Sequence, residues 1–407
     1  MKILVADYIY TPEGFVEYQA VAFDEHIRAV DTLEKLLEAY PKAEIVRTAP
    51  HSVIYPGFIN THVHLEFSAN RTSLEYGSFM PWLDSVIANR DELMQCCDNK
   101  IMQEECDNML RSGITTFGAI SSFGTELEVC EQTPQRVVFF NELIGSNAQY
   151  ADMLYGDFLE RLKASQGCTE ESKVIPAVAI HSPYSVHPVI LQKAVALAKE
   201  HKMPLSTHFL ESQAEREWLE KGEGEFKAFF EKYFNASTPV TNIEEFMHAF
   251  DNYPAHFTHA VQATKEELAY LQSKGHSIAH CPRSNRYLGC GRLAIEVLRE
   301  LDLPYSVATD GLSSNDSLSI FDEFRAALML HHQAPINKLA PLLIKASTQD
   351  AAEILGLNCG KIKADRLADL VVVTLPDLPQ SKEEIALWSI IHTKEVSEVY
   401  IQGIKYV

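Results

Sequence analysis

Two histidines that are two residues apart, His62 and His64, follow the apolar run IYPGF in the segment NTHVHLEF. In an extended strand, residues two apart point to the same face, so both imidazoles can reach one ion. A single H-x-H pair is a weak signal, because two polar loop histidines would explain it about equally well. The pair indicates a metal site only if further ligands are found elsewhere in the chain.

Three later apolar runs also end in a residue that can bind metal or move a proton. His208 ends PLSTH, His259 ends AHFTH and Asp310 ends PYSVATD. In a (β/α)8 barrel the C-terminal ends of the strands converge around one mouth, so residues far apart in sequence can share one site. Taken singly, each residue is more simply a capping or hydrogen-bonded core side chain. Taken together, they indicate a site at the mouth of a barrel.

His62, His64, His208 and Asp310 form a set that suits one divalent metal ion. Imidazole and carboxylate ligands accept Zn²⁺ and Fe²⁺ alike and leave a position for a water molecule with a lowered pKa. Glu211 stands three residues after His208 in STHFLES, where it could transfer protons without binding the metal. Considered alone, Glu211 is explained equally well as a solvated carboxylate in the first turn of a helix.

Alternating apolar runs and helical patterns predict an α/β fold, a (β/α)8 TIM barrel with a small composite β-sandwich domain built from both termini. We expect residues 1–55 and 360–407 to form the composite domain and residues 56–359 to form the barrel. We expect the polar insertion 210–254 to be a loop on the active face. Eight runs are the candidate barrel strands: YPGFINTHVHL, GITTFGAI, RVVFFNELIG, KVIPAVAIH, MPLSTHFLE, AHFTHAV, HSIAHCP and PYSVATD.

The composition limits the partners that the chain can have. A length of 407 residues suits one barrel of about 250 residues with a smaller module. The formal net charge of −21 disfavours nucleic acid and anionic membranes as partners. The N-terminus lacks the pattern of a secretory signal, and eight cysteines without paired C-x-x-C motifs favour reduced thiols. We expect a cytoplasmic enzyme with a small-molecule substrate, and a homo-oligomer is left open.

Several motifs, in order along the chain, resemble the amidohydrolase superfamily in its adenosine, S-adenosylhomocysteine and guanine deaminase branch. They are PGFINTHVHLE, HSPYSV, STHFLES, THAV, HCPRSN and ATDGLSSND, and ADLVVV and IQGIKYV resemble the composite β domain of such enzymes. The resemblance implies one metal ion on His62, His64, His208 and Asp310. Binuclear members carry a bridging lysine at the end of the fourth strand, whereas the corresponding run KVIPAVAIHSPY ends in His181.

The same resemblance implies roles for the residues around the metal. Glu211 would pass a proton from water to a ring nitrogen, His259 would orient the water, and Asp310 would help to pass a proton to departing ammonia. His181 resembles the histidine that contacts substrate in the family, and a buried strand-end histidine is the alternative.

More narrowly, FSANRTSLEYGSFMPWLDSV and SVATDGLSSNDSLSIFDEFRAAL resemble aminofutalosine deaminases of menaquinone biosynthesis. This resemblance implies conversion of an adenine nucleoside, 6-amino-6-deoxyfutalosine, to futalosine and ammonia. Trp82 is a candidate to stack on the aromatic tail of that substrate, although aromatic residues in helices more often pack in the core. Ser284 and Asn285 would shape the neighbouring loop, and Cys281 and Cys290 are expected to be structural.

The metal ligands alone do not distinguish among the electrophiles that such a site can attack. Deamination of methylthioadenosine or S-adenosylhomocysteine, of guanine or of cytosine, and hydrolysis by another kind of amidohydrolase are the alternatives. The segment GSNAQYADML has no clear counterpart of the arginines found in the homocysteine-type relatives. A non-catalytic metal-binding barrel is the alternative from another class, and the presence of both Glu211 and His259 argues against it.

Overall fold

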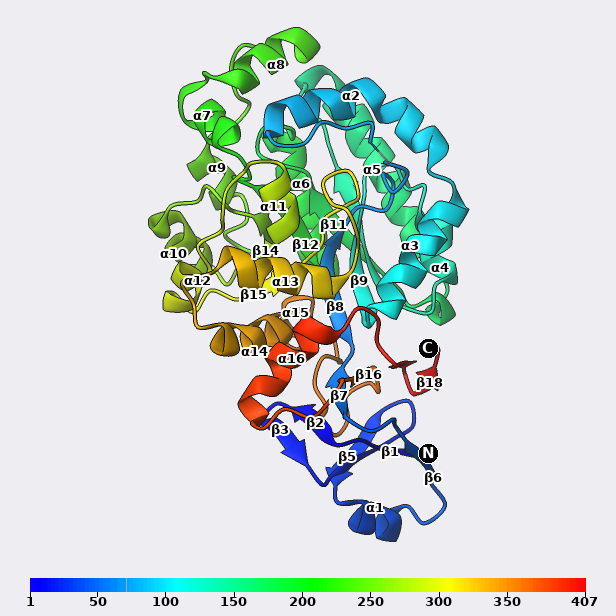
Figure 1. The fold of residues 1–407 in the computed structure, drawn as a ribbon. Coiled ribbons are helices and arrows are strands. Elements are labelled where there is room, and N and C mark those ends of the chain that lie inside the picture. The colour runs from blue at the N-terminus through cyan, green and yellow to red at the C-terminus, as the bar shows by residue number, and fades with distance from the viewer. Residues whose placement is uncertain (71) are drawn as a thin grey trace. The chain divides into compact units, whose positions relative to one another are not determined.

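The computed structural model describes residues 1–70 and 72–407. Arg71, which lies within one of the motifs compared above, is outside the described residues. Eight strands form one sheet in the order β15-β14-β13-β12-β11-β10-β9-β8, so each strand neighbours its predecessor in the sequence (Figure 1). The strands are β8 (Phe58–Val63), β9 (Ile114–Ser121), β10 (Arg136–Leu143), β11 (Val174–Ile180), β12 (Leu205–Phe209), β13 (His256–His259), β14 (Ser277–His280) and β15 (Tyr305–Val307).

Each of these strands coincides with one of the eight apolar runs, and the predicted TIM barrel is confirmed. The pairs from β10 to β15 are parallel, and the Asp310 backbone N–H donates to the His62 carbonyl at 3.1 Å, which joins the last strand to the first. The helices that follow the strands are α2 (Phe79–Cys96), α3 (Asn99–Arg111), α4 (Leu127–Gln132), α5 (Ala151–Gln166), α6 (Pro188–His201), α10 (Lys265–Ser273), α11 (Pro282–Tyr287), α12 (Ile295–Glu300), α13 (Ile320–Leu330), α14 (Ile336–Ala346) and α15 (Gln349–Ile354). Of the helices described, none combines the length and apolar character needed to cross a membrane.

The insertion 210–254 is not the loop that its polar composition suggested. It contains three helices, α7 (Gln213–Lys221), α8 (Glu225–Phe234) and α9 (Ile243–His248). In α8, Phe226, Phe229 and Phe230 are buried, and their i, i+3, i+4 spacing forms one apolar face that stabilises the helix. The helix that was expected to begin at Glu211 corresponds to α7, whereas α8 and α9 were missed. In α8, the charged residues between these aromatic side chains hid the helical period.

Strands from both ends of the chain form the predicted composite β-sandwich. A six-stranded sheet has the order β18-β17-β16-β7-β2-β3 and a four-stranded sheet has the order β5-β4-β1-β6. Phe23 and Val21 of the smaller sheet pack in one core with Ile54, Leu370 and Tyr400 of the larger sheet. The elements are β1 (Lys2–Val5), β2 (Tyr8–Thr11), β3 (Gly14–Glu17), β4 (Ala20–Phe23), β5 (Ile27–Asp31), α1 (Leu33–Ala39), β6 (Glu44–Arg47), β7 (Ser52–Pro56), β16 (Leu370–Thr374), α16 (Ile385–His392), β17 (Glu398–Ile401) and β18 (Ile404–Lys405).

By packing, the chain divides into two compact units. One contains residues 1–60, 106–117 and 319–407, and the other contains residues 61–105 and 118–318. The domain limits expected at residues 55 and 360 stay a prediction. Every candidate site residue named above lies in the second unit.

Candidate metal and catalytic site

The candidate ligands occupy the C-terminal ends of parallel barrel strands, where such strands present their side chains to a common mouth. His62 lies near the end of β8 and His64 directly after it, His208 lies in β12, His259 ends β13, and Asp310 follows β15. His62 and His259 are at most 1% exposed, and Asp310 is buried as well. The side chains of His64 and His208 are 13% exposed, so the site is largely but not completely shielded from bulk water.

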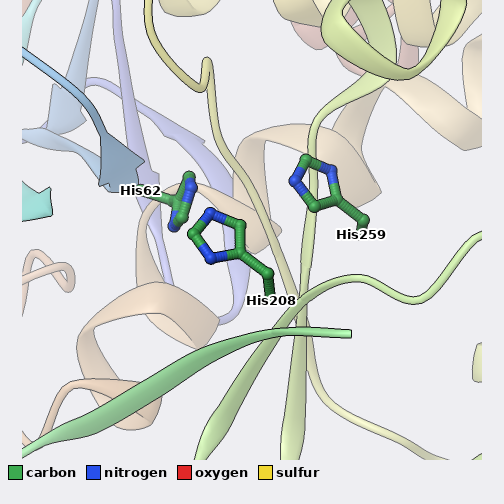
Figure 2. A group of neighbouring side chains, drawn as sticks. All are labelled: His62, His208 and His259. Carbon is green, nitrogen blue, oxygen red and sulfur yellow. The ribbon is translucent and has the colours of Figure 1, made fainter. Parts of the chain in front are cut away.

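The structure brings these side chains together. His64 Nε2 lies 3.3 Å from His208 Nε2, and Asp310 Oδ1 lies 3.8 Å from His62 Nε2 and 3.7 Å from His64 Nε2. The rings of His62, His208 and His259 gather around one region in Figure 2, with ring centres 4.8 Å apart for His62 and His208 and 5.7 Å apart for His208 and His259. Such spacing places several ring nitrogens around one point.

Hydrogen bonds on the outer ring nitrogens leave the inner ones free to bind a metal. His208 Nδ1 donates to the His181 carbonyl at 2.8 Å; because a carbonyl oxygen only accepts, the proton lies on Nδ1 and Nε2 carries a lone pair. His62 Nδ1 pairs with Thr258 Oγ1 at 3.1 Å, and His62 Nε2 is buried without a hydrogen-bond partner among the described residues. A buried ring nitrogen without a hydrogen-bond partner, such as His62 Nε2, is costly, and a cation bound there would satisfy it.

The charge states of these groups suit metal binding. Burial lowers the pKa of His62 well below its usual value and lowers the pKa of His64 to about 3, so both rings are neutral, as ligands must be. Burial raises the pKa of Asp310, but the rings of His64, His259 and His208 outweigh it, and the pKa lies below its usual value. Three neutral imidazoles and one carboxylate fit a divalent ion such as Zn²⁺ or Fe²⁺.

Glu211 is buried beside this group. Its side chain is 9% exposed, and its Oε2 lies 3.6 Å from His259 Nε2. The residue precedes α7, whose N-cap is Ser212, so it is not a solvated carboxylate within the first helical turn. Burial, followed by the charges of Asp310 and Glu215, raises the pKa of Glu211 well above its usual value. The raised pKa favours the protonated form of Glu211, and a nearby cation would favour release of its proton.

His259 faces both acidic groups through one nitrogen. Its Nδ1 bonds to Asn285 Oδ1 at 2.8 Å, which leaves Nε2 directed at Glu211 and, at 3.9 Å, at Asp310 Oδ2. Burial lowers the pKa of His259 to about 4. The backbone of His259 is left-handed, with φ of 71°, and that of Asp310 is as well, at 59°. Non-glycine residues in this conformation are strained, and such strain clusters at functional sites.

Two neighbours of Glu211 were not assigned to the site from the sequence: Glu215, which was not named, and Cys290, which was expected to be structural. Glu215 accepts the Leu210 N–H at 3.0 Å and the Glu211 N–H at 2.8 Å, and Ser212 Oγ accepts the Glu215 N–H, so the turn that carries Glu211 is fixed. The spacing S-x-x-E of a capping box was the signal that could have revealed it. Cys290 Sγ lies 3.9 Å from Glu211 Oε1, so this cysteine borders the site.

The carboxylate of Asp310 is held on both oxygens. Its Oδ2 accepts hydrogen bonds from Ser284 Oγ at 2.8 Å and Ser314 Oγ at 3.0 Å, and its Oδ1 accepts the Gly311 N–H at 2.8 Å. Ser284 therefore supports the site through Asp310, in agreement with the expectation that it shapes the surroundings of the site.

The two residues predicted to contact the substrate lie on different elements: His181 directly follows β11, and Trp82 lies in α2. The ring centre of His181 is 5.1 Å from that of His208, and its Nδ1 pairs with Ser185 Oγ at 2.6 Å. Trp82 lies in α2 and donates its indole N–H to the Ser313 carbonyl at 2.7 Å, which ties α2 to the loop after β15. Their contacts with a substrate stay a prediction.

The family model described as "Amidohydrolase family" matches residues 53–405. The chain belongs to the amidohydrolase family. It is 42% identical over 407 residues to aminodeoxyfutalosine deaminase of a Nitratiruptor species, with 100% of both chains covered. It is 36% identical to adenosine deaminase of Helicobacter pylori, with 95% of this chain and 94% of that protein covered. The crystal structure of Helicobacter pylori aminofutalosine deaminase in complex with methylthio-coformycin matches all of both chains with a TM-score of 0.95 and 34% identity.

In this amidohydrolase, Gly311 allows the Asp310 loop to lie against His64. An added Cβ at Gly311 would lie 2.8 Å from both the Cβ and the carbonyl oxygen of His64. We expect Gly311→Ala to displace His64, to lower stability by about 1 to 3 kcal/mol and to weaken metal binding. Thermal unfolding and metal content after dialysis measure both effects. Gly156→Ala in α5 is the matched control, because nothing described lies within 4 Å of its added Cβ; equal behaviour of the two variants would contradict the prediction.

Proposed function

We propose that this amidohydrolase is a metal-dependent hydrolytic deaminase that converts the 6-amino group of an adenine nucleoside to a carbonyl and releases ammonia. One observation carries the proposal: single ligand atoms of Glu211, His259 and Asp310 lie within 4.8 Å of one another, directly beside the imidazoles of His62 and His64. Side chains that can transfer protons therefore lie next to side chains that can bind a metal ion.

We propose His62, His64, His208 and Asp310 as the ligands of one Zn²⁺ or Fe²⁺ ion. When bound, the ion would supply Lewis-acid activation of a water molecule and lower its pKa towards neutrality. The Nε2 lone pair of His208, the buried His62 Nε2 that has no hydrogen-bond partner among the described residues, and the charged Asp310 carboxylate support this assignment.

Deamination also needs an acid, because the amide anion is a very poor leaving group. Glu211 is the residue suited to the first proton transfer: it accepts a proton from the attacking water and delivers it to the ring nitrogen beside the reacting carbon. His259 Nε2, which lies 3.6 Å from Glu211 and 3.9 Å from Asp310, orients the water between them. Asp310 then helps to move the second proton to the departing ammonia.

We further propose 6-amino-6-deoxyfutalosine as the preferred nucleoside. The relative from Nitratiruptor is named for deamination of this compound and aligns along the whole chain at 42% identity. The structure from Helicobacter pylori carries the same kind of name. Adenosine is the second candidate, because another relative is named adenosine deaminase. We propose Trp82 and His181 as contacts to the substrate.

The test is ammonia release from a panel of 6-amino-6-deoxyfutalosine, adenosine, methylthioadenosine and S-adenosylhomocysteine, with kcat/KM measured for each. We expect the highest kcat/KM with the first. A higher value for another nucleoside would overturn the substrate assignment, and no ammonia from any of the four would overturn deamination of these nucleosides and favour a non-catalytic metal-binding barrel.

Removal of the metal provides an independent check. A chelator is expected to abolish ammonia release, and readdition of one ion per chain is expected to restore it, because the water is not activated otherwise. Metal analysis of protein purified without added metal distinguishes zinc from iron. Full activity of a chain shown to be metal-free would contradict the proposed metal centre.

A further inference from the structure

A fully buried carboxylate lies behind the proposed ligand His208. Glu142 stands one residue before the end of β10 and is 0% exposed. Its Oε2 accepts a hydrogen bond from Ser122 Oγ at 2.5 Å, whereas its Oε1 has no hydrogen-bond partner among the described residues. Such an oxygen is costly to bury unless a positive or polarised group faces it.

The group that it faces is the outer nitrogen of His208. Glu142 Oε1 lies 3.7 Å from His208 Nδ1, the nitrogen that donates its proton to the His181 carbonyl. The same carbonyl accepts the backbone N–H of His208 at 2.9 Å, so ring and backbone are oriented together. Nδ1–H therefore points away from the proposed metal, and Nε2 points towards it.

We propose that Glu142 is a positioning residue that raises the affinity of His208 for the metal. This inference rests on the proposed metal centre. A metal on Nε2 draws electron density from the imidazole and makes Nδ1–H more positive. A carboxylate 3.7 Å away stabilises that polarised ring and holds it in place, and the low-dielectric surroundings strengthen the effect. Ser122 directs the carboxylate by binding its other oxygen.

A second buried glutamate provides a matched control. Glu126 is also 0% exposed and accepts a hydrogen bond from Ser121 Oγ at 3.0 Å. Its carboxyl faces Glu66 and not a ring of the site, and burial together with Glu66 raises its pKa well above the usual value. Glu126→Gln therefore removes a buried acid that faces no ring of the site, at the same depth as Glu142.

The experiment measures the affinity of the purified full chain for Zn²⁺ by competition with a chelator, without reference to catalysis. We expect Glu142→Gln to bind Zn²⁺ about 10- to 100-fold more weakly than the unaltered chain, with Glu126→Gln near the unaltered value. Ser122→Ala, which releases the carboxylate without removing it, is expected to show a smaller loss in the same direction. Thermal unfolding of the metal-free variants checks that each is folded, and the rise in Tm on Zn²⁺ addition should be smallest for Glu142→Gln.

The outcomes separate this inference from the proposed function. If the unaltered chain binds no Zn²⁺ or Fe²⁺, the metal centre itself fails. If the unaltered chain binds Zn²⁺ and folded Glu142→Gln binds it equally well, only the role of Glu142 is overturned. An equal loss in Glu142→Gln and Glu126→Gln would likewise overturn it, because the effect would then come from disturbed packing.

Discussion

Glu211→Gln is expected to lower kcat by about 10²-fold or more while the metal stays bound. The substitution keeps the shape of the side chain but removes the only group at this position that can accept a proton and return it. Glu211 is surrounded by Cys290, His259 and the Glu215-capped turn, so the amide should occupy the same place. Steady-state kinetics and metal content of the same preparation measure the two effects.

Glu220→Gln in α7 is the control for this variant. Its side chain is 41% exposed and pairs with Arg216, and it lies in the helix that directly follows Glu211 without belonging to the site. We expect unaltered kinetics for it. If Glu211→Gln retains full kcat, the assignment of proton transfer to Glu211 is wrong, whereas loss of the metal together with activity would show that Glu211 acts on the metal instead.

The barrel could be predicted because each strand is marked in the sequence by a short apolar run. The same rule explains why the ligands were found: His208 lies near the end of such a run and Asp310 comes just after one, at the edge where parallel strands present their ends. The helix α8 was missed although Phe226, Phe229 and Phe230 have helical spacing. The charged residues between them give the insertion a polar composition that hides this period.

Other features depend on contacts that no local pattern reveals. Glu142 lies within the apolar run RVVFFNEL, which forms β10. Nothing in that run predicts that the Glu142 carboxylate faces His208 in β12. The hydrogen bond of Trp82 to Ser313 joins positions 231 residues apart. Contacts between residues on different strands depend on how the sheet is assembled. They can be identified only when the strand order and register are known.

Asp310→Asn is expected to remove the metal and to lower kcat/KM by about 10³-fold. Lewis-acid activation by a bound metal supplies several kcal/mol, and about 1.4 kcal/mol corresponds to a tenfold change in rate. The carboxylate oxygens already accept from Ser284, Ser314 and Gly311. An amide nitrogen in place of Oδ1 would face the Gly311 N–H, a donor against a donor, and one in place of Oδ2 would force the two serine hydroxyls to accept instead of donate, so the present set of hydrogen bonds cannot be kept.

Metal content after dialysis and kcat/KM for the preferred nucleoside measure this result. Asp316→Asn is the matched control, because Asp316 lies in the same loop, is 65% exposed and pairs with Arg283 outside the set of proposed ligands. Retention of both the ion and full activity in Asp310→Asn would mean that the three imidazoles suffice. Loss of the ion in this variant but not in Asp316→Asn is expected instead, because Asp310 carries the only negative charge among the proposed ligands, and without it three neutral rings must compensate a divalent cation alone.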